Sequence, residues 1–250
     1  METKYNNLFI LIPFISLMSL GLLMVTSASI YIADDIYGNP FHFASRQMFF
    51  ISIGLIVMLL FLSVPSNLLY KLDWVFMLIS ILLLLALFIP DVGTSVNGSI
   101  RWIRLGPINI QPSEICKFSL ILYVSGYSVR RISEIDSLRS FLKPLFLLFI
   151  ISVLIMGQPD LGSTAIICML VVAILFYAGI SFFQFSLLSI LIGLLGVVAI
   201  SSSPMRIARM MAYMDPFDKE VVLGSGYQLS NSLISIGQGG WLGLGIGNSF

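Results

Sequence analysis

Charged residues are scarce in this chain of 250 residues, because only 10% of its side chains carry a charge. A soluble domain has about 25% charged residues. Hydrophobic residues make up 58% of the sequence, and the mean hydropathy is +1.02. This composition excludes a soluble globular domain and indicates an integral membrane protein.

Dense basic runs are also missing, and the formal net charge is only +1. A protein that follows a phosphate backbone needs a basic patch or stripe. The sequence therefore predicts no nucleic-acid partner.

Cysteine and histidine are nearly absent. Cys116 and Cys168 both lie inside apolar runs, and the single histidine, His42, has no ligand partner at a metal-binding spacing. Disulfide frameworks and structural metal sites need several such residues at fixed spacings. We therefore expect neither a disulfide framework nor a metal site formed by the protein.

Long apolar runs are abundant, and we interpret seven of them as membrane spans, since a span needs about 20 residues. They cover approximately residues 8–32, 47–64, 74–89, 115–129, 144–156, 163–178 and 185–201. The first is interpreted as a retained span, because no small-residue cleavage site with a polar mature region follows it. The predicted fold is all-α, a polytopic transmembrane helical bundle.

Lysine and arginine counts in the connecting segments are equal on the two sides of the membrane, so they do not decide the orientation. The most basic connection is residues 130–143. We predict a cytoplasmic N-terminus, which places this cluster in the cytoplasm. Residues 91–114 and 202–250 are then loops on the outer side.

Two of the predicted spans begin after similar polar turns. Residues 111–114 read Gln-Pro-Ser-Glu and residues 158–160 read Gln-Pro-Asp. Gln111 or Ser113 can cap the first helix, Glu114 suits the positive end of its dipole, and Asp160 can cap the second helix. Both turns lie on one face of the membrane, so the two helix starts would form an anion site if they were neighbours.

Lys117 lies about one turn inside the fourth span, where a lysine costs about 2.5–3.5 kcal/mol on insertion scales. It can pair with Glu114 three residues earlier or snorkel to the interface. Alternatively it lines a cavity that opens outward, where Asp160 would be a suitable partner. Arg101 and Arg104 flank Trp102, and the two arginines can hold a phosphate or lie in the headgroup layer.

Together these residues resemble the SEDS family (shape, elongation, division and sporulation) of peptidoglycan glycosyltransferases. Five segments carry the resemblance, in chain order: Arg101-Trp102-Ile103, residues 111–117, residues 158–162, residues 226–229 and residues 245–249. Residues 24–29, 37–41 and 206–209 resemble the division-specific branch, FtsW, more than the elongation branch, RodA.

The resemblance implies a single SEDS-type membrane domain of about ten spans, of which residues 1–250 hold the first seven. It implies polymerisation of lipid II into glycan at the division septum, in the bacterial inner membrane, with a class B penicillin-binding transpeptidase and other division proteins as partners. It also implies that Lys117 and Asp160 line the central cavity. Our candidate substrate-binding residues are Arg101, Trp102, Gln111, Ser113, Glu114, Lys117 and Asp160. The family's presumed catalytic aspartate belongs to a His-Thr-Asp-Phe stretch that would follow Phe250, so the fragment alone is expected to be inactive.

In this reaction a sugar hydroxyl attacks the anomeric carbon of the donor, a carboxylate takes the proton and the diphosphate leaves. Cationic side chains or a divalent cation, Mg²⁺ or Mn²⁺, would stabilise the leaving charge. Two other functions stay open. A lipid II flippase would equally use an intramembrane Lys and Asp, and a non-catalytic division scaffold would need neither.

Overall fold

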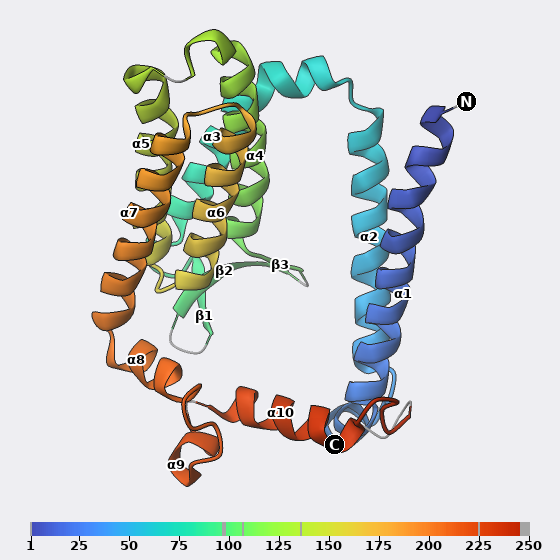
Figure 1. The fold of residues 1–250 in the computed structure, drawn as a ribbon. Helices are drawn as coiled ribbons and strands as arrows, with labels where there is room; N and C mark the ends of the chain where they lie inside the picture. Colours follow the sequence, from blue (N-terminus) through green and yellow to red (C-terminus); the bar gives the residue numbers. More distant parts are fainter. Residues whose placement is uncertain (1, 97–98, 107, 136, 225, 246–250) are drawn as a thin grey trace. The chain divides into compact units, whose positions relative to one another are not determined.

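The computed structural model describes residues 2–96, 99–106, 108–135, 137–224 and 226–245. Its contacts divide the chain into two compact units, residues 1–63 with 205–250, and residues 64–204. In the described part, the seven longest helices are α1 (Glu2–Tyr37), α2 (His42–Ser63), α3 (Ser66–Ala86), α4 (Pro112–Arg130), α5 (Leu138–Met156), α6 (Leu161–Tyr177) and α7 (Phe182–Ser201) (Figure 1). The helical multi-pass prediction is thus confirmed.

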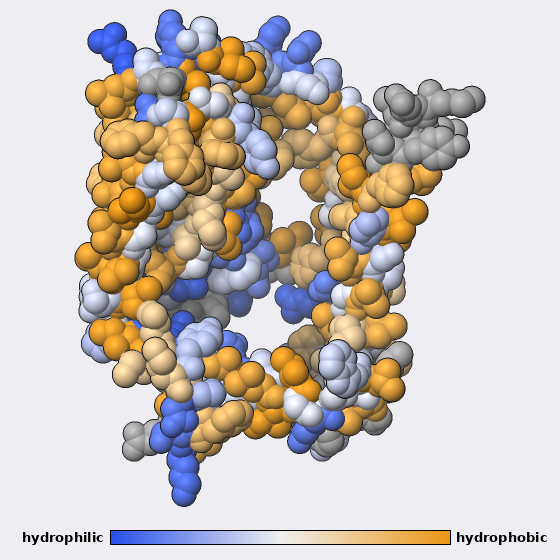
Figure 2. All heavy atoms as spheres, in the orientation of Figure 1, coloured by the Kyte–Doolittle hydropathy of each residue, from blue (hydrophilic) through white to orange (hydrophobic). Residues whose placement is uncertain are grey.

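Among the described residues, five helices are long and apolar enough to cross a membrane: α2, α3, α5, α7 and residues 8–37 of α1. Helix α6 is apolar but has only 17 residues, and α4 carries Glu114, Lys117 and Arg130. Figure 2 shows hydrophobic side chains over the visible side of α7. The large exposed hydrophobic residues of α7 include Leu187, Ile190, Leu191, Leu194, Leu195, Val197 and Val198. Such a surface suits contact with lipid, in which a polar face would be costly.

Each of the seven long helices begins before the predicted start of its span. Helix α3 begins at Ser66 rather than near residue 74, and α5 begins at Leu138 rather than at Pro144. Ser137 caps α5, because its side chain accepts a hydrogen bond from the backbone N–H of Ser140. Residues 138–143, predicted as part of a basic loop, therefore form the first turns of α5.

Pro144 lies inside α5, where proline normally removes a hydrogen bond to the carbonyl four residues earlier. That carbonyl belongs to Ser140, and here it accepts a hydrogen bond of 3.0 Å from the hydroxyl of Tyr127 on α4. The partner that proline cannot supply is thus replaced by a side chain from a neighbouring helix.

The outer loop predicted at residues 91–114 contains a small antiparallel sheet. Its strands are β1 (Gly93–Val96), β2 (Ser99–Leu105) and β3 (Ile108–Ile110), in the order β1-β2-β3. Ile103 pairs with Gly93 on one side and Ile110 on the other. Because Ile103 is buried and Arg104 is exposed, the alternation of β2 gives the sheet an inner and an outer face.

Within residues 64–204, α4 packs against α3 and α6, and α6 also packs against α5 and α7. The core between these helices is apolar, and its fully buried side chains include Leu84, Leu120, Val124, Ile151, Ile155, Ile167, Val171 and Leu175. Antiparallel packing brings the ends of α3 and α5 and the starts of α4 and α6 to one end of this unit, beside the sheet (Figure 1).

In the other unit, α1 packs against α2. Residues 202–250, predicted as the start of a large outer loop, include the short helices α8 (Pro204–Met211), α9 (Lys219–Val222) and α10 (Tyr227–Gly239). Of the segments that carry the family resemblance, residues 246–249 lie outside the described part of the chain.

Candidate functional site

The starts of α4 and α6 are neighbours in space, as the anion-site hypothesis required. Gln111, the residue that precedes α4, directs its amide Nε2 to Oδ2 of Asp160, the residue that precedes α6, at 3.5 Å. Both helices thus present their unpaired backbone N–H groups at the same end of the unit. This neighbourhood defines the helix-start junction: Arg101, Gln111, Ser113, Pro159, Asp160 and Ser163.

Asp160 caps α6, as predicted. Its Oδ1 accepts a hydrogen bond of 3.1 Å from the backbone N–H of Ser163, and its Oδ2 accepts one of 2.8 Å from the Ser163 hydroxyl. The backbone carbonyl of Asp160 also accepts a hydrogen bond from the hydroxyl of Thr164. The residue is only 5% exposed, so this carboxylate is fixed in position by donors on its own helix.

Arg101 on β2 brings a positive charge to Asp160. Its Nη1 lies 3.8 Å from Oδ1 of Asp160, and its Nη2 donates to the Pro159 carbonyl and to Ser99 Oγ. The arginine side chain keeps 33% of its surface exposed, whereas that of Asp160 keeps 7%. The guanidinium is therefore oriented by the protein and still accessible from outside.

Two buried polar atoms at the helix-start junction lack a hydrogen-bond partner in the described structure, Arg101 Nε and Ser113 Oγ. Buried polar groups are nearly always paired, so such atoms call for an explanation. Ser113 is only 2% exposed. The junction thus retains hydrogen-bonding capacity that the described residues do not use.

The predicted capping of α4 by Gln111 or Ser113 is wrong. No side chain caps the backbone of α4 at its first residue, because the Gln111 amide is directed to Asp160 and Ser113 Oγ has no partner among the described residues. Pro112 does occupy the first turn, and Glu114 lies there as expected. The side chains of Gln111 and Ser113, which the local sequence predicts to cap α4, are thus available for contacts with other elements.

Lys117 pairs with Glu114 on its own helix rather than with Asp160. Its Nζ lies 2.7 Å from Glu114, while Asp160 is paired with Arg101. The alternative pair between Lys117 and Asp160 is therefore not formed. The lysine side chain is 18% exposed and the glutamate side chain 58%.

Arg101 and Arg104 have different surroundings, although both lie on β2. Arg101 lies where the pairing with β1 is irregular, between Trp102, which faces Thr94, and Ile100, which faces Ser95. Arg104 and Trp102 instead line a cavity of about 240 Å³ together with Thr94 and Asn109. Only Arg101 belongs to the helix-start junction.

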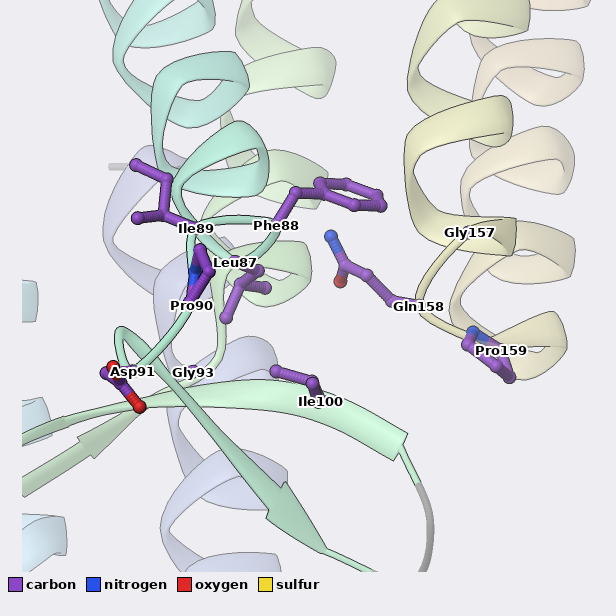
Figure 3. A pocket seen from close by; sticks show the side chains of 10 residues that line it. All are labelled: Leu87, Phe88, Ile89, Pro90, Asp91, Gly93, Ile100, Gly157, Gln158 and Pro159. Atoms are coloured by element: carbon purple, nitrogen blue, oxygen red, sulfur yellow. The ribbon is translucent and has the colours of Figure 1, made fainter.

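A larger cavity, of about 430 Å³, lies beside the helix-start junction (Figure 3). It is bounded by the end of α3, the sheet and the turn between α5 and α6, and its lining residues are Leu87, Phe88, Ile89, Pro90, Asp91, Gly93, Ile100, Gly157, Gln158 and Pro159. The lining is mainly apolar. Figure 3 shows the Gln158 side chain extending from the turn toward the end of α3.

Sequence reasoning missed a second ion pair at the opposite end of the unit. Arg130 Nη2 lies 2.7 Å from Oδ2 of Asp73, whose side chain is 2% exposed, and the Arg130 guanidinium stacks 5.0 Å from the Tyr70 ring. In the predicted order of spans, Asp73 lies just before the third span and Arg130 lies at the start of the basic connection. The usable signal was the antiparallel order of α3 and α4, which puts the start of one beside the end of the other.

The donor set does not fit a metal ion held by the protein alone. No group of three His, Cys, Asp or Glu side chains comes together in the described part of the chain. Both oxygens of Asp160 already accept hydrogen bonds, and an arginine lies beside them.

Residues 7–250 match the FtsW/RodA/SpoVE family, described as cell cycle proteins. A protein of Legionella pneumophila, described as a probable peptidoglycan glycosyltransferase FtsW, is 41% identical over 235 residues, which cover 93% of this chain and 59% of that protein. The chain spans less than two thirds of the length of the curated relatives that it matches.

Two solved structures are similar in fold. One is a chain from a peptidoglycan synthase complex, studied for its coordination of polymerization and crosslinking; it is 26% identical, with a TM-score of 0.63 over 89% of this chain and 66% of that chain. The other is the rod shape determining protein RodA of Thermus thermophilus, 19% identical, with a TM-score of 0.51 over 93% of this chain and 87% of that chain.

Proposed function

Because the chain belongs to the FtsW/RodA/SpoVE family of cell cycle proteins, we propose that the protein is a peptidoglycan glycosyltransferase that polymerises lipid II into glycan strands. Relatives described as probable peptidoglycan glycosyltransferases support the reaction class. The observation that carries the proposal is the helix-start junction, where Arg101 lies beside Asp160 between the N-terminal ends of α4 and α6.

Lipid II carries a diphosphate, and its transfer requires that the leaving diphosphate be stabilised. Helix N-terminal ends favour anions, and a guanidinium offers planar donors that match phosphate oxygens. Arg101 is such a guanidinium beside a helix N-terminal end. The Pro159 carbonyl and Asp160 orient it, and its side chain is still 33% exposed.

Asp160 has a supporting role in this proposal. A general base must accept a proton from the attacking sugar hydroxyl. Both oxygens of Asp160 already accept hydrogen bonds from Ser163 and the carboxylate is buried. Asp160 thus orients Arg101, and we assign no catalytic base to the described residues.

We also propose that the protein acts at the division septum, with its N-terminus in the cytoplasm and a class B penicillin-binding transpeptidase as partner. The similarity to a chain of a peptidoglycan synthase complex supports a partnership with a transpeptidase. The basic segment around residues 130–143 supports the orientation, because cytoplasmic connections carry an excess of Lys and Arg.

The test compares Arg101→Gln with Arg104→Gln, a matched loss of one arginine from the same strand outside the helix-start junction. Each full-length protein is purified with its transpeptidase partner and incubated with labelled lipid II, and the products are separated on a gel. We expect Arg101→Gln to lower glycan formation by at least about 10-fold, because it removes a donor to the leaving charge. Arg104→Gln should keep most of the activity.

Equal losses in the two variants would remove the helix-start junction from the reaction. No glycan from the wild type, alongside movement of lipid II across vesicles, would favour a flippase, and neither activity would favour a division scaffold. The expectation of a divalent cation stays a prediction. Treating the wild type with EDTA and then restoring Mg²⁺ or Mn²⁺ checks it.

A further inference from the structure

Gln158 connects the turn between α5 and α6 to the end of α3. Its Nε2 donates a hydrogen bond of 3.2 Å to the backbone carbonyl of Leu84, and the residue is only 5% exposed. The last carbonyls of a helix have no partner within the helix. The next two carbonyls, of Leu85 and Ala86, accept from the backbone N–H groups of Phe88 and Ile89, so Leu84 depends on a different donor.

Three consecutive residues of this turn bind different elements. Gln158 binds α3, the Pro159 carbonyl accepts from Arg101 on β2, and Asp160 accepts from Gln111 at the start of α4. Asp160 also caps α6. A shift of Gln158 would therefore move both groups that hold Arg101, because they belong to the next two residues along the backbone.

Packing and a hydrogen bond both hold this turn against the end of α3, since a Cβ at Gly157 would lie only 3.0 Å from Cζ of Phe88. Gly157, Gln158 and Pro159 all border the cavity of about 430 Å³ (Figure 3). The buried amide must be hydrogen-bonded to avoid a desolvation cost, so its bond to Leu84 fixes the position of the turn.

We propose that Gln158 is a positioning residue for the helix-start junction: it holds the turn against α3 and so sets where Pro159 and Asp160 present Arg101. This inference rests on the proposed function for its effect on catalysis. Its structural content is that the Gln158 amide holds the turn whose Pro159 carbonyl accepts from Arg101 on β2, and this stands independently of any activity.

The test uses the full-length protein with Gln158→Leu, which keeps a similar volume and removes the amide. The control is Gln184→Leu, which removes a glutamine at the start of α7, where it forms a capping box with Ser181. Amide hydrogen exchange is followed in residues 99–105 and 158–164. Gln158→Leu should raise exchange in both segments by roughly 10-fold, since local opening becomes easier, whereas Gln184→Leu should change neither.

Kinetics with lipid II give the second readout. Gln158→Leu should lower kcat by about 10-fold or more with little change in KM, because small misplacements of a catalytic group weaken transition-state contacts. Gln158→Glu adds a rescue test, since a protonated carboxylic acid can donate to the Leu84 carbonyl and an ionised one cannot. Its activity relative to wild type should recover as the pH is lowered, and that of Gln158→Leu should not.

Unchanged exchange in residues 99–105 of Gln158→Leu would overturn the proposal, whatever happens to activity. Equal loss of kcat in Gln158→Leu and Gln184→Leu would also overturn it, because that result reflects general stability. If the wild type makes no glycan, the proposed function fails, while the exchange comparison still decides whether Gln158 positions the strand.

Discussion

Asp73 and Arg130 form an ion pair that joins the start of α3 to the end of α4. The carboxylate is 2% exposed and the Arg130 side chain 36%. Arg130 also directs Nη1 to the Tyr70 carbonyl at 3.5 Å, so the guanidinium binds two residues of α3. This pair lies at the end of the unit opposite the helix-start junction, and it fixes α3 and α4 against each other.

Asp73→Ala should destabilise the protein, because it leaves the Arg130 guanidinium without its partner. Breaking a fully buried pair costs about 3–5 kcal/mol, and the exposure of Arg130 reduces that to about 1–3 kcal/mol. The measurement is the thermal unfolding midpoint of the purified protein in detergent. Glu134→Ala is the control, because it breaks an exposed pair with Arg131, and exposed pairs contribute little. Equal midpoints for the two variants would contradict the prediction.

Gly126→Ala should also destabilise this contact. A Cβ at position 126 would lie 2.3 Å from Oδ2 of Asp73 and 3.3 Å from Nη1 of Arg130. The carboxylate would have to move away from its arginine, at a cost of about 1–3 kcal/mol. Gly54→Ala on α2 is the control, since a Cβ there meets nothing within 4 Å. A double variant of Asp73→Ala and Gly126→Ala should lose less stability than the sum of the single changes.

A comparison of Asp160→Asn with Asp160→Ala should distinguish the effect of capping α6 from the effect of the negative charge beside Arg101. Asparagine is as good an N-cap as aspartate, whereas alanine costs about 1 kcal/mol at that position. Asp160→Asn should therefore stay close to the wild type in thermal unfolding and still lower glycan formation, because Arg101 loses its anionic partner. Asp160→Ala should lower both. Full activity in Asp160→Asn would show that the charge of Asp160 has no part in orienting Arg101.

Lys117→Ala should reduce glycan formation while the protein is made at a normal level. The lysine is paired with Glu114, so the change also frees that carboxylate. Glu114→Gln breaks the same pair and leaves the amine in place, which makes the comparison informative. A greater loss for Lys117→Ala than for Glu114→Gln in the lipid II assay would indicate a direct role of the cation. Unchanged activity in Lys117→Ala would remove Lys117 from the site.

Local sequence predicted those features that depend on chain neighbours. The apolar runs gave the helices, Pro112 and Asp160 marked the starts of α4 and α6, and the spacing of Glu114 and Lys117 allowed the pair that forms. The start of α5 was misplaced because Pro144 reads locally as a helix start. Its lost hydrogen bond is replaced by Tyr127, a partner that local sequence cannot reveal.

What the sequence by itself determined is the membrane character, the helical order and the presence of two similar helix starts, because length, apolarity and capping act between residues close along the chain. Only the tertiary structure decided which side chains from distant parts of the chain pair with each other. Arg101 lies 59 positions before Asp160, and Gln158 reaches Leu84 across 74 positions. Such contacts depend on how α3, α4, α5, α6 and the sheet pack, since packing alone brings groups so distant in the chain within hydrogen-bonding reach.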